Sequence, residues 1–485
     1  MIKNPFACIG LSFAATLFAL NLLPDFSLVL FAASAVCLGL CLFLKSLPER
    51  GSAAVLFLGV MAAAVLFTAT QKAVWEPALA MDRQIGTLHG TATGETSVNA
   101  EQGRCFSVIR TDEGLKVTIV TNENYDLEPG DRVTFTGKLY ADQTWSRRAG
   151  RVFLTCWYPK NLTVQRAKRN PARDWPFYAR RFLIERITQQ VGGEAGDAAA
   201  AMVTGEKEGL SDETYAAFSR AGVAHIIAVS GLHMNLIVLA LYGFLRRALH
   251  VRRQLGAAVS IAAAWAYAAV ADFTPSAVRA CIMVCAFFGA TLFHRRISPL
   301  NSLGLAAFSI LLFNPYAVCS ASFELSFAAT LGLLTIGRKL LAADPFDRVK
   351  FKLLRGVLKA LYATLAITFS ATVGCLPVFL FLGVDATFAC FVSNLATFFA
   401  VAPSLITGLF TALPGVFGRL SALLCRLCVN YILLVVNKVG SMKWLPLLSL
   451  QAAVIFAAVF LLGFLVSACR KRIRKKKAEA VRTKE

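Results

Sequence analysis

Residues 360–383 read ALYATLAITFSATVGCLPVFLFLG, a stretch without a single charged side chain. A helix needs roughly 20 mostly apolar residues to cross a bilayer, so this stretch predicts a membrane span. Similar stretches occur along most of the 485-residue chain, of which 57% is hydrophobic and only 16% charged. Because soluble domains carry about 25% charged residues, the composition predicts a polytopic α-helical membrane protein.

Two groups of apolar stretches flank one polar segment. The N-terminal group occupies residues 1–80, and its first stretch lacks a signal-peptide cleavage site, so we interpret it as a retained span. The larger group occupies residues 193–468. Together they predict about 12 spans or re-entrant helices, at 6–23, 26–44, 53–74, 224–245, 255–271, 276–293, 299–313, 317–337, 360–383, 387–413, 420–436 and 446–468. The short or interrupted stretches 299–313 and 420–436 are the candidates for re-entrant pieces.

Membrane topology explains most of the net charge of +22. Lys and Arg concentrate in cytoplasmic loops because positively charged loops are not translocated. This rule places both termini in the cytoplasm and the polar segment outside. Basic clusters then fall on the inside, at Arg246-Arg247, His294-Arg295-Arg296, Arg338-Lys339 and in the basic tail, residues 469–485. The charge alone is therefore no evidence for nucleic-acid binding.

The polar segment, residues 81–165, shows the period-2 alternation of β-strands at 105–109, 115–120 and 132–137. Glu128-Pro-Gly-Asp is a turn signal between two of these stretches. Several short strands in a segment of this size favour an extracytoplasmic all-β domain with an OB-like barrel. Its two cysteines, Cys105 and Cys156, would face an oxidising compartment, and we expect a disulfide between them.

Residues 166–192 combine a helical pattern with basic and aromatic side chains. Arginines such as Arg180, Arg181 and Arg186 alternate with Trp175 and its aromatic neighbours. Helices that lie on a membrane surface show this composition. We therefore expect a basic amphipathic interfacial helix on the outer face.

The stretch 205–235 carries polar residues inside and beside an expected span. Ser211 is placed to cap a short amphipathic helix, and Ser230 and His233 would share one face of the span that follows. Imidazole groups in a span are costly unless they face a polar cavity or a partner. These residues indicate either a polar path or hydrogen bonds that only join neighbouring helices. The candidates are His225, Ser230, Gly231, His233 and Asn235.

Later spans contain further polar groups and prolines. Arg279 and Glu324 are ionisable, so they should face protein or water rather than lipid, and an ion pair between them is one alternative. We expect Pro275, Pro315, Pro377 and Pro403 to break spans, which is tolerated where helices line a cavity. The pattern predicts the interior of a channel or transporter, with Arg279, Glu324, Ser326, Pro377 and Asn394 as candidate lining residues.

These motifs resemble the competence domain of the ComEC family. The matching parts are the run 205–235, Pro-Ser-x-x-Arg at 275–279, Phe-Glu-Leu-Ser-Phe at 323–327 and Ser-Asn-Leu-Ala at 393–396. The order of N-terminal spans, OB-like domain and competence domain is also similar. The resemblance implies a channel that passes single-stranded DNA across the cytoplasmic membrane of a bacterium during natural transformation.

One departure from the family pattern concerns the C-terminus. Many members continue into a metallo-β-lactamase-like domain, whereas this sequence stops at its basic tail and has no His-x-His-x-Asp-His cluster, so we expect a short form. No Gly-x-x-x-x-Gly-Lys-Ser/Thr loop occurs either. The other cysteines lie in or beside apolar stretches, so we expect neither a metal nor a cofactor. The expected partners are DNA, membrane lipid, and separate receptor, motor or strand-binding, and nuclease proteins, with duplex DNA at the outer face as an open alternative.

The polar domain has as many acidic as basic residues between 86 and 165, whereas a groove that follows a DNA backbone should be basic. A local cluster could still offer charge and stacking, with candidate DNA contacts at Trp145, Arg147, Arg148, Arg151, Trp157 and Tyr158. Two other functions are open alternatives. An intramembrane hydrolase based on Ser230 would lack a base from a separate element, and a small-solute transporter usually shows internal repeats, which we do not find.

Overall fold

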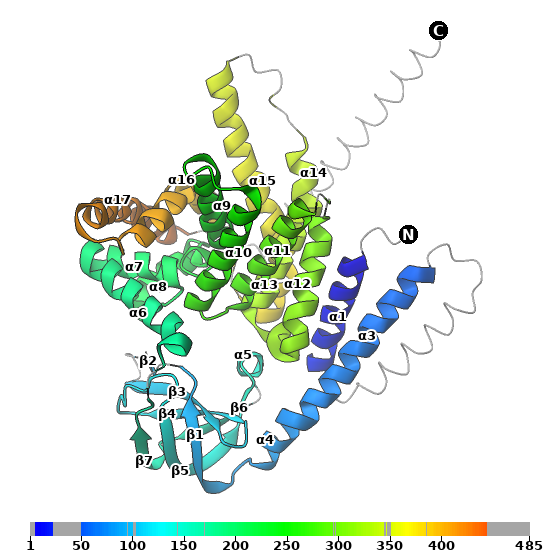
Figure 1. Cartoon of the computed structure of the whole chain (residues 1–485), viewed down its shortest axis with the longest axis vertical. Helices are drawn as coiled ribbons and strands as arrows, with labels where there is room; N and C mark the ends of the chain where they lie inside the picture. The colour runs from blue at the N-terminus through cyan, green and yellow to red at the C-terminus, as the bar shows by residue number, and fades with distance from the viewer. Residues whose placement is uncertain are drawn as a thin grey trace.

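The computed structural model describes residues 5–22, 50–94, 96–99, 103–142, 144–168, 170–293, 295, 297–343, 346, 351–384 and 386–443. The expected spans at 26–44 and 446–468 and the basic tail lie outside the described residues. The described chain forms a helical domain with a β-barrel domain at one end (Figure 1).

The barrel domain contains seven strands: β1 (Ile85–Ala92), β2 (Ser97–Asn99), β3 (Arg104–Thr111), β4 (Lys116–Thr121), β5 (Arg132–Ala141), β6 (Val152–Trp157) and β7 (Lys160–Gln165). Five of them close into a ring in the order β1-β3-β4-β6-β5, because β5 also pairs with β1. The β4–β6 pairing is parallel and the other pairings are antiparallel. A closed five-stranded barrel confirms the OB-like domain, and the predicted strands correspond to β3, β4 and β5.

The predicted disulfide is wrong. Cys105 pairs with Thr121 across β3 and β4, whereas Cys156 pairs with Ile119 across β4 and β6. Strand β4 therefore separates the two cysteines by two strand spacings, about 10 Å, and a disulfide needs Cα atoms within about 7 Å. Both thiols are free and buried, and burial raises the pKa of the Cys156 thiol to about 11.

A buried carboxylate ties the barrel to the segment that leaves it. Asp131 accepts hydrogen bonds from the amides of Ala167 (3.0 Å) and Glu128 (3.1 Å) and from the Arg166 guanidinium (2.7 Å). Burial would raise the pKa of Asp131, but these donors outweigh burial and hold the pKa below its ordinary value. The 128–131 turn expected from the sequence is thus fixed by its last residue.

The helical domain contains α1 (Pro5–Leu22), α3 (Arg50–Thr70), η2 (Gln71–Trp75), α4 (Glu76–Ala80), α6 (Pro171–Val191), α7 (Gly193–Thr204), α8 (Asp212–Arg220), η3 (Ala224–Ile226), α9 (Gly231–Arg247), α10 (Arg253–Val270), α11 (Pro275–Leu292), α12 (Pro299–Phe313), η4 (Pro315–Cys319), α13 (Ala321–Gly332), η5 (Leu333–Gly337), α14 (Arg338–Leu341), α15 (Lys352–Leu382), α16 (Ala389–Phe410) and α17 (Gly415–Gly440). Helix α6 confirms the helix expected within 166–192. The α8 N-cap is Ser211, as expected, because its side chain accepts from the Thr214 amide.

Four described helices are long and apolar enough to cross a membrane, namely α1, α15, α16 and α17. Helix α17 is continuous over 26 residues, so the interruption expected at 420–436 is wrong. Pro377 and Pro403 lie inside continuous helices, α15 and α16, so the breaks expected there are also wrong. Pro275 and Pro315, by contrast, begin α11 and η4, where a missing amide hydrogen costs nothing.

Glycine contacts bring pairs of helices into direct backbone contact. A Cβ atom added to Gly304 of α12 would lie 2.1 Å from the Phe6 carbonyl oxygen of α1, and one on Gly10 would lie 1.9 Å from the Gly304 oxygen. Gly332 of α13 and Gly374 of α15 approach in the same way, with 3.1 Å from either built Cβ to the other Cα. Small residues at such crossings are typical of helices packed in membranes.

Candidate functional site

The expected span at 224–245 is not one continuous helix. The chain forms the short helix η3, and α9 starts only at Gly231. Ser230 is the N-cap, because its Oγ accepts from the His233 amide at 3.4 Å and its carbonyl accepts from the Met234 amide at 3.2 Å. The prediction that Ser230 and His233 share a helix face is therefore wrong, since Ser230 precedes the helix.

Arg279 of α11 is buried, with 7% of its surface exposed. Its Nη1 donates to the Ser326 carbonyl of α13 at 3.1 Å and to the Thr330 hydroxyl. The Ser326 hydroxyl in turn lies 3.1 Å from that of Ser276 on α11. These contacts join α11 to α13, and the guanidinium is the centre of the network.

The same guanidinium lies against the first residue of α9. A Cβ atom added to Gly231 would lie only 2.1 Å from Arg279 Nη2, so a larger residue at this position would displace the end of the Arg279 side chain. His233, in the first turn of α9, is 1% exposed, and its Nδ1 has no hydrogen-bond partner among the described residues. The structure thus brings Ser230, Gly231, His233, Arg279 and Ser326 into one group, which we call the α9–α11–α13 cluster.

Glu324 on α13 is also buried, with 7% exposed, but it does not pair with Arg279. Its Oε1 accepts a hydrogen bond of 3.2 Å from the indole of Trp145 in the barrel domain. Its Oε2 has no partner within the described chain. Each of the two buried ionisable side chains therefore lacks an ionic counterpart in the described structure. Burying an unpaired charge costs free energy, and such groups in membrane proteins usually bind a ligand or serve a function.

Trp145 belongs to α5 (Trp145–Ala149), the short helix between β5 and β6 that lies between the barrel and the helical domain in Figure 1. The Trp145 ring packs edge-on against Phe18 of α1 and Phe381 of α15, with centroids 5.6 and 5.2 Å apart. The hydrophobic cores of the two domains are continuous here, through Trp75, Phe153 and Tyr316.

Two arginines, Arg148 within α5 and Arg151 just after it, bind the C-terminal ends of helices. Arg148 donates to the Asn21 carbonyl of α1 at 2.8 Å, and its guanidinium covers the Trp75 ring at 4.4 Å. Arg151 donates to Asn314 Oδ1 at 3.0 Å and to the Phe313 carbonyl at the end of α12. The C-terminus of a helix is the negative end of its dipole, so both contacts are electrostatically favourable. Trp145, Arg148 and Arg151 thus dock the barrel onto the helical domain.

The other predicted DNA-contact residues lie apart from this docking surface. Arg147 is held within the barrel domain by Thr118 (2.6 Å) and Asp142 (3.7 Å). Trp157 and Tyr158 are exposed, at 42% and 47%.

Sequence reasoning missed three residues around these exposed rings. Tyr140 is 41% exposed on β5, Arg104 lies 5.5 Å from the Trp157 ring, and Lys138 lies 5.5 Å from the Tyr140 ring. Tyr140 pairs with Thr155, two residues before Trp157, and both rings line a hollow of about 470 Å³ at the end of β5 and β6. We call Arg104, Lys138, Tyr140, Trp157 and Tyr158 the aromatic shelf.

Four candidate channel residues are not joined to the α9–α11–α13 cluster by any hydrogen bond of the described chain. His225 on η3 and Asn235 on α9 are exposed, as is Pro377 on α15, whereas Asn394 on α16 is half-buried. The neighbouring Ser393 is fully buried, and its hydroxyl has no partner within the described part of the chain.

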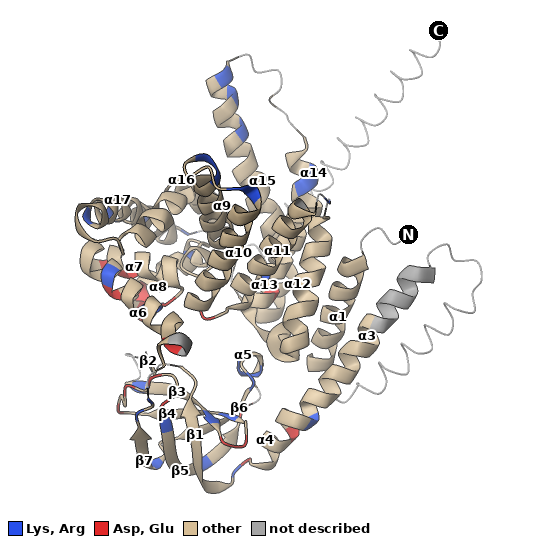
Figure 2. Cartoon of the chain, viewed as in Figure 1, with Lys and Arg blue, Asp and Glu red and all other residues tan. Residues whose placement is uncertain are grey.

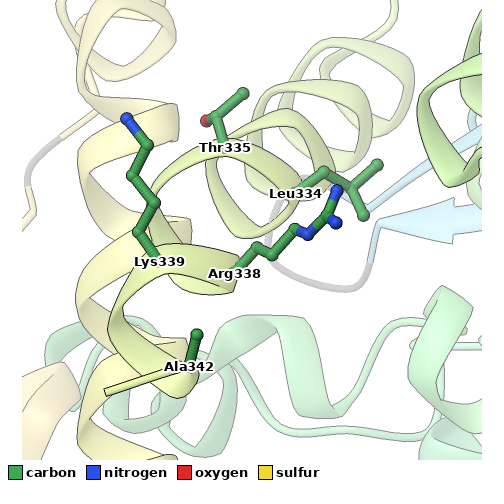
Figure 3. Close-up of a pocket in the computed structure, with 5 residues that line it drawn as sticks. All are labelled: Leu334, Thr335, Arg338, Lys339 and Ala342. Carbon is green, nitrogen blue, oxygen red and sulfur yellow. The ribbon is translucent and has the colours of Figure 1, made fainter. Parts of the chain in front are cut away.

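Figure 3 shows a second hollow, of about 460 Å³, along η5 and α14. Leu334, Thr335 and Ala342 line it together with Arg338 and Lys339, whose side chains extend in different directions. It shares no residue with the cluster. Among the described residues, no group of three His, Cys, Asp or Glu side chains is placed to hold a metal ion.

Comparison with known proteins places the cluster inside one matching region. Residues 202–472 match the family described as "Competence protein". The chain is 28% identical over 181 residues to ComE operon protein 3 of Bacillus subtilis (strain 168), covering 37% of this chain and 21% of that protein. It is 28% identical over 172 residues to Competence protein ComA of Neisseria gonorrhoeae, covering 33% of this chain and 25% of ComA. The chain therefore aligns with a quarter or less of each relative, and no solved structure matches it. Because the family match covers more than half of the sequence, this chain belongs to the competence protein family, as its resemblance to ComEC proteins predicts.

Proposed function

We propose that this chain is a channel that passes single-stranded DNA across the cytoplasmic membrane during natural transformation. The observation that carries the proposal is the buried Arg279, which has no ionic counterpart in the described structure and lies beside the start of α9. A phosphate group needs a cation or hydrogen-bond donors when it leaves water, and arginine binds phosphate well. The printed names of the relatives, ComE operon protein 3 and Competence protein ComA, agree with a role in competence.

The distribution of charge supports an orientation with the barrel outside the cytoplasm. Figure 2 shows Lys and Arg at the α9–α10 loop, on α14 and at the start of α15, which lie at the end of the helical domain away from the barrel. Basic residues mark the cytoplasmic side of a membrane protein. In this orientation the barrel meets DNA first, and α6 lies at the outer surface, where exposed Trp175, Tyr178 and Phe182 contact lipid headgroups.

We further propose that the aromatic shelf, rather than α5, contacts DNA on the barrel. Bases stack on exposed aromatic rings, and neighbouring cations bind the phosphates, without need for a particular sequence. Trp157 and Tyr140 offer such rings, and Arg104 and Lys138 supply the cations. Trp145, Arg148 and Arg151 are already bound to helix ends or to Glu324.

The proposed partners are single-stranded DNA, membrane lipid and separate proteins for DNA capture, for the driving force and for degradation of the other strand. Their identification rests on the family resemblance. A gradient across the membrane is the alternative source of driving force.

Uptake of fluorescently labelled DNA in a competent host lacking its own copy of the protein tests the function. Wild type should restore uptake, and Arg279→Ala or Glu324→Ala at equal membrane abundance should not. Gly243→Ala is the matched control, because a Cβ atom at Gly243 meets nothing within 4 Å. A deletion strain that takes up DNA normally would contradict the channel function, and a defect limited to a small solute would favour the transporter alternative.

A further inference from the structure

We propose that the first turn of α9 and the Arg279 guanidinium form a binding site for a phosphodiester group. The site consists of the backbone of Gly231 and Leu232, the Arg279 side chain and the neighbouring His233. That its natural ligand is the DNA backbone rests on the proposed function, whereas binding of a phosphodiester can be tested without transport.

The start of α9 presents backbone amide donors. The Gly231 and Leu232 amides donate to no acceptor in the described chain, because the Ser230 side chain takes up only the His233 amide. Free amides at the N-terminus of a helix carry about half a positive charge together with the dipole, and they bind anions. At this end of α9, Gly231 is buried beside Arg279, whereas the Leu232 side chain is 63% exposed.

Arg279 supplies the second and independent indication of a ligand. The side chain is more than nine-tenths buried, its Nε has no partner within the described structure, and its Nη2 points at Gly231. Its hydrogen bonds go to a carbonyl and a hydroxyl, which carry no net charge. A full positive charge therefore faces the positive end of a helix dipole with no described carboxylate between them. Two like charges in contact repel, and an anion bound beside both of them would remove the repulsion.

The donors around the guanidinium match the two unesterified oxygens of a phosphodiester. Nη2 and Nε lie on one edge of the guanidinium and can donate two hydrogen bonds to the two unesterified oxygens of a phosphodiester. The α9 amides can bind the same oxygens from the other side. Interrupted helices in transporters bind anionic substrates with helix N-termini in this manner.

Glu324, the acidic residue of the Phe-Glu-Leu-Ser-Phe motif, does not neutralise this site. Glu324 is bound to Trp145 at the barrel interface and forms no ion pair with Arg279. His233, in the same turn, adds a buried ring nitrogen that has no hydrogen-bond partner within the described structure. The site therefore combines donors and one cation, and its ligand should carry a single negative charge and two free oxygens.

Thermal unfolding of the full chain in detergent, titrated with dimethyl phosphate at constant ionic strength, tests the site. We expect a saturable rise of Tm for wild type and for the control Gly243→Ala, which lies on the same helix in open space. In Gly231→Ala the new methyl group would displace Nη2, and we expect the apparent affinity to fall at least tenfold. Arg279→Lys, which keeps the charge and loses the paired donors, should show a similar loss.

The outcomes separate the site from the channel. No saturable rise in wild type, or an equal rise in Arg279→Lys, would overturn the site. If Gly231→Ala does not fold, the titration of Arg279→Lys alone tests whether the phosphodiester site exists. If the rise is lost in both variants while DNA uptake by them stays normal, the site exists but does not serve transport. If the site fails in this titration while deletion still abolishes uptake, the channel function stands without it.

Discussion

Removing the Trp145 indole should weaken the docking of the barrel in two separable steps. Trp145→Phe keeps a ring between Phe18 and Phe381 but removes the hydrogen bond to Glu324. A hydrogen bond to a charged group contributes about 1.5–3 kcal/mol. Trp145→Ala also removes two aromatic contacts, each worth about 0.5–1.5 kcal/mol, so the docked state should lose about 2.5–6 kcal/mol in total.

Hydrogen exchange of the full chain, followed by mass spectrometry on peptides that cover η4, measures this loss. The amides of η4 are buried beneath α5, so their exchange requires undocking, and the rate should rise about 10- to 150-fold in Trp145→Phe. Trp145→Ala should exchange faster still. Trp157→Ala is the control, because that ring is 42% exposed and its ring contacts are with Arg104 and Tyr158 of the barrel. Unchanged exchange of η4 in Trp145→Ala, or an equal rise in Trp157→Ala, would refute the docking role.

Three further results are expected. The folded-state pKa of Asp131 lies below its unfolded value, so the Asp131 carboxylate stabilises the fold above about pH 4 and this stabilisation is lost as the pH falls through the folded-state pKa. Asp131→Asn should therefore lower the free energy of unfolding by about 1–3 kcal/mol near pH 7. It should also flatten the pH dependence of hydrogen exchange in the barrel. Gly304→Val should separate α12 from α1 and lower the Tm and the membrane abundance of the protein, whereas Gly243→Val, in open space, should have little effect on either. Alkylation of unfolded protein without reductant should modify both Cys105 and Cys156, and protection of the pair would contradict the observed strand order.

Local signals in the sequence predicted local structure well. Alternating residues located β3, β4 and β5, and a single serine located the start of α8. The missed disulfide shows the limit of such signals. Cysteine content and compartment favour a pair, but only the order of strands reveals that β4 lies between Cys105 and Cys156.

Hydropathy misled the interpretation of 224–230 because it averages over a window. Because Ile226, Ile227 and Val229 continue the apolar stretch, hydropathy predicts a span that runs through Ser230. The break depends on one capping side chain and on a glycine that meets Arg279, a residue nearly fifty positions later. A contact between residues so far apart in the sequence cannot be predicted from the local composition.

Trp and Arg in the sequence of α5 indicate a candidate DNA surface, because these residue types are typical of one. The same residue types also suit docking, since arginine donates to the carbonyls that helix ends leave free. Arg148 and Arg151 bind the ends of α1 and α12, and their charge is balanced there by two helix dipoles. Residue types therefore identified the chemistry of this segment but not the partner.

The balance of charge differs sharply between these arginines and Arg279, and this difference favours Arg279 as the point where an anion would be held. At the barrel interface, cations meet the negative ends of helices, so an incoming phosphate would compete with contacts that already exist. At α9, a cation meets the positive end of a helix, so a phosphate would be bound without displacing any described carboxylate. A DNA strand that passed from the barrel to the helical domain would thus first meet Arg148 and Arg151, whose charges are balanced by helix dipoles. It would next meet Arg279, whose charge is not balanced. Such an order attracts the backbone inward without trapping it at the entrance.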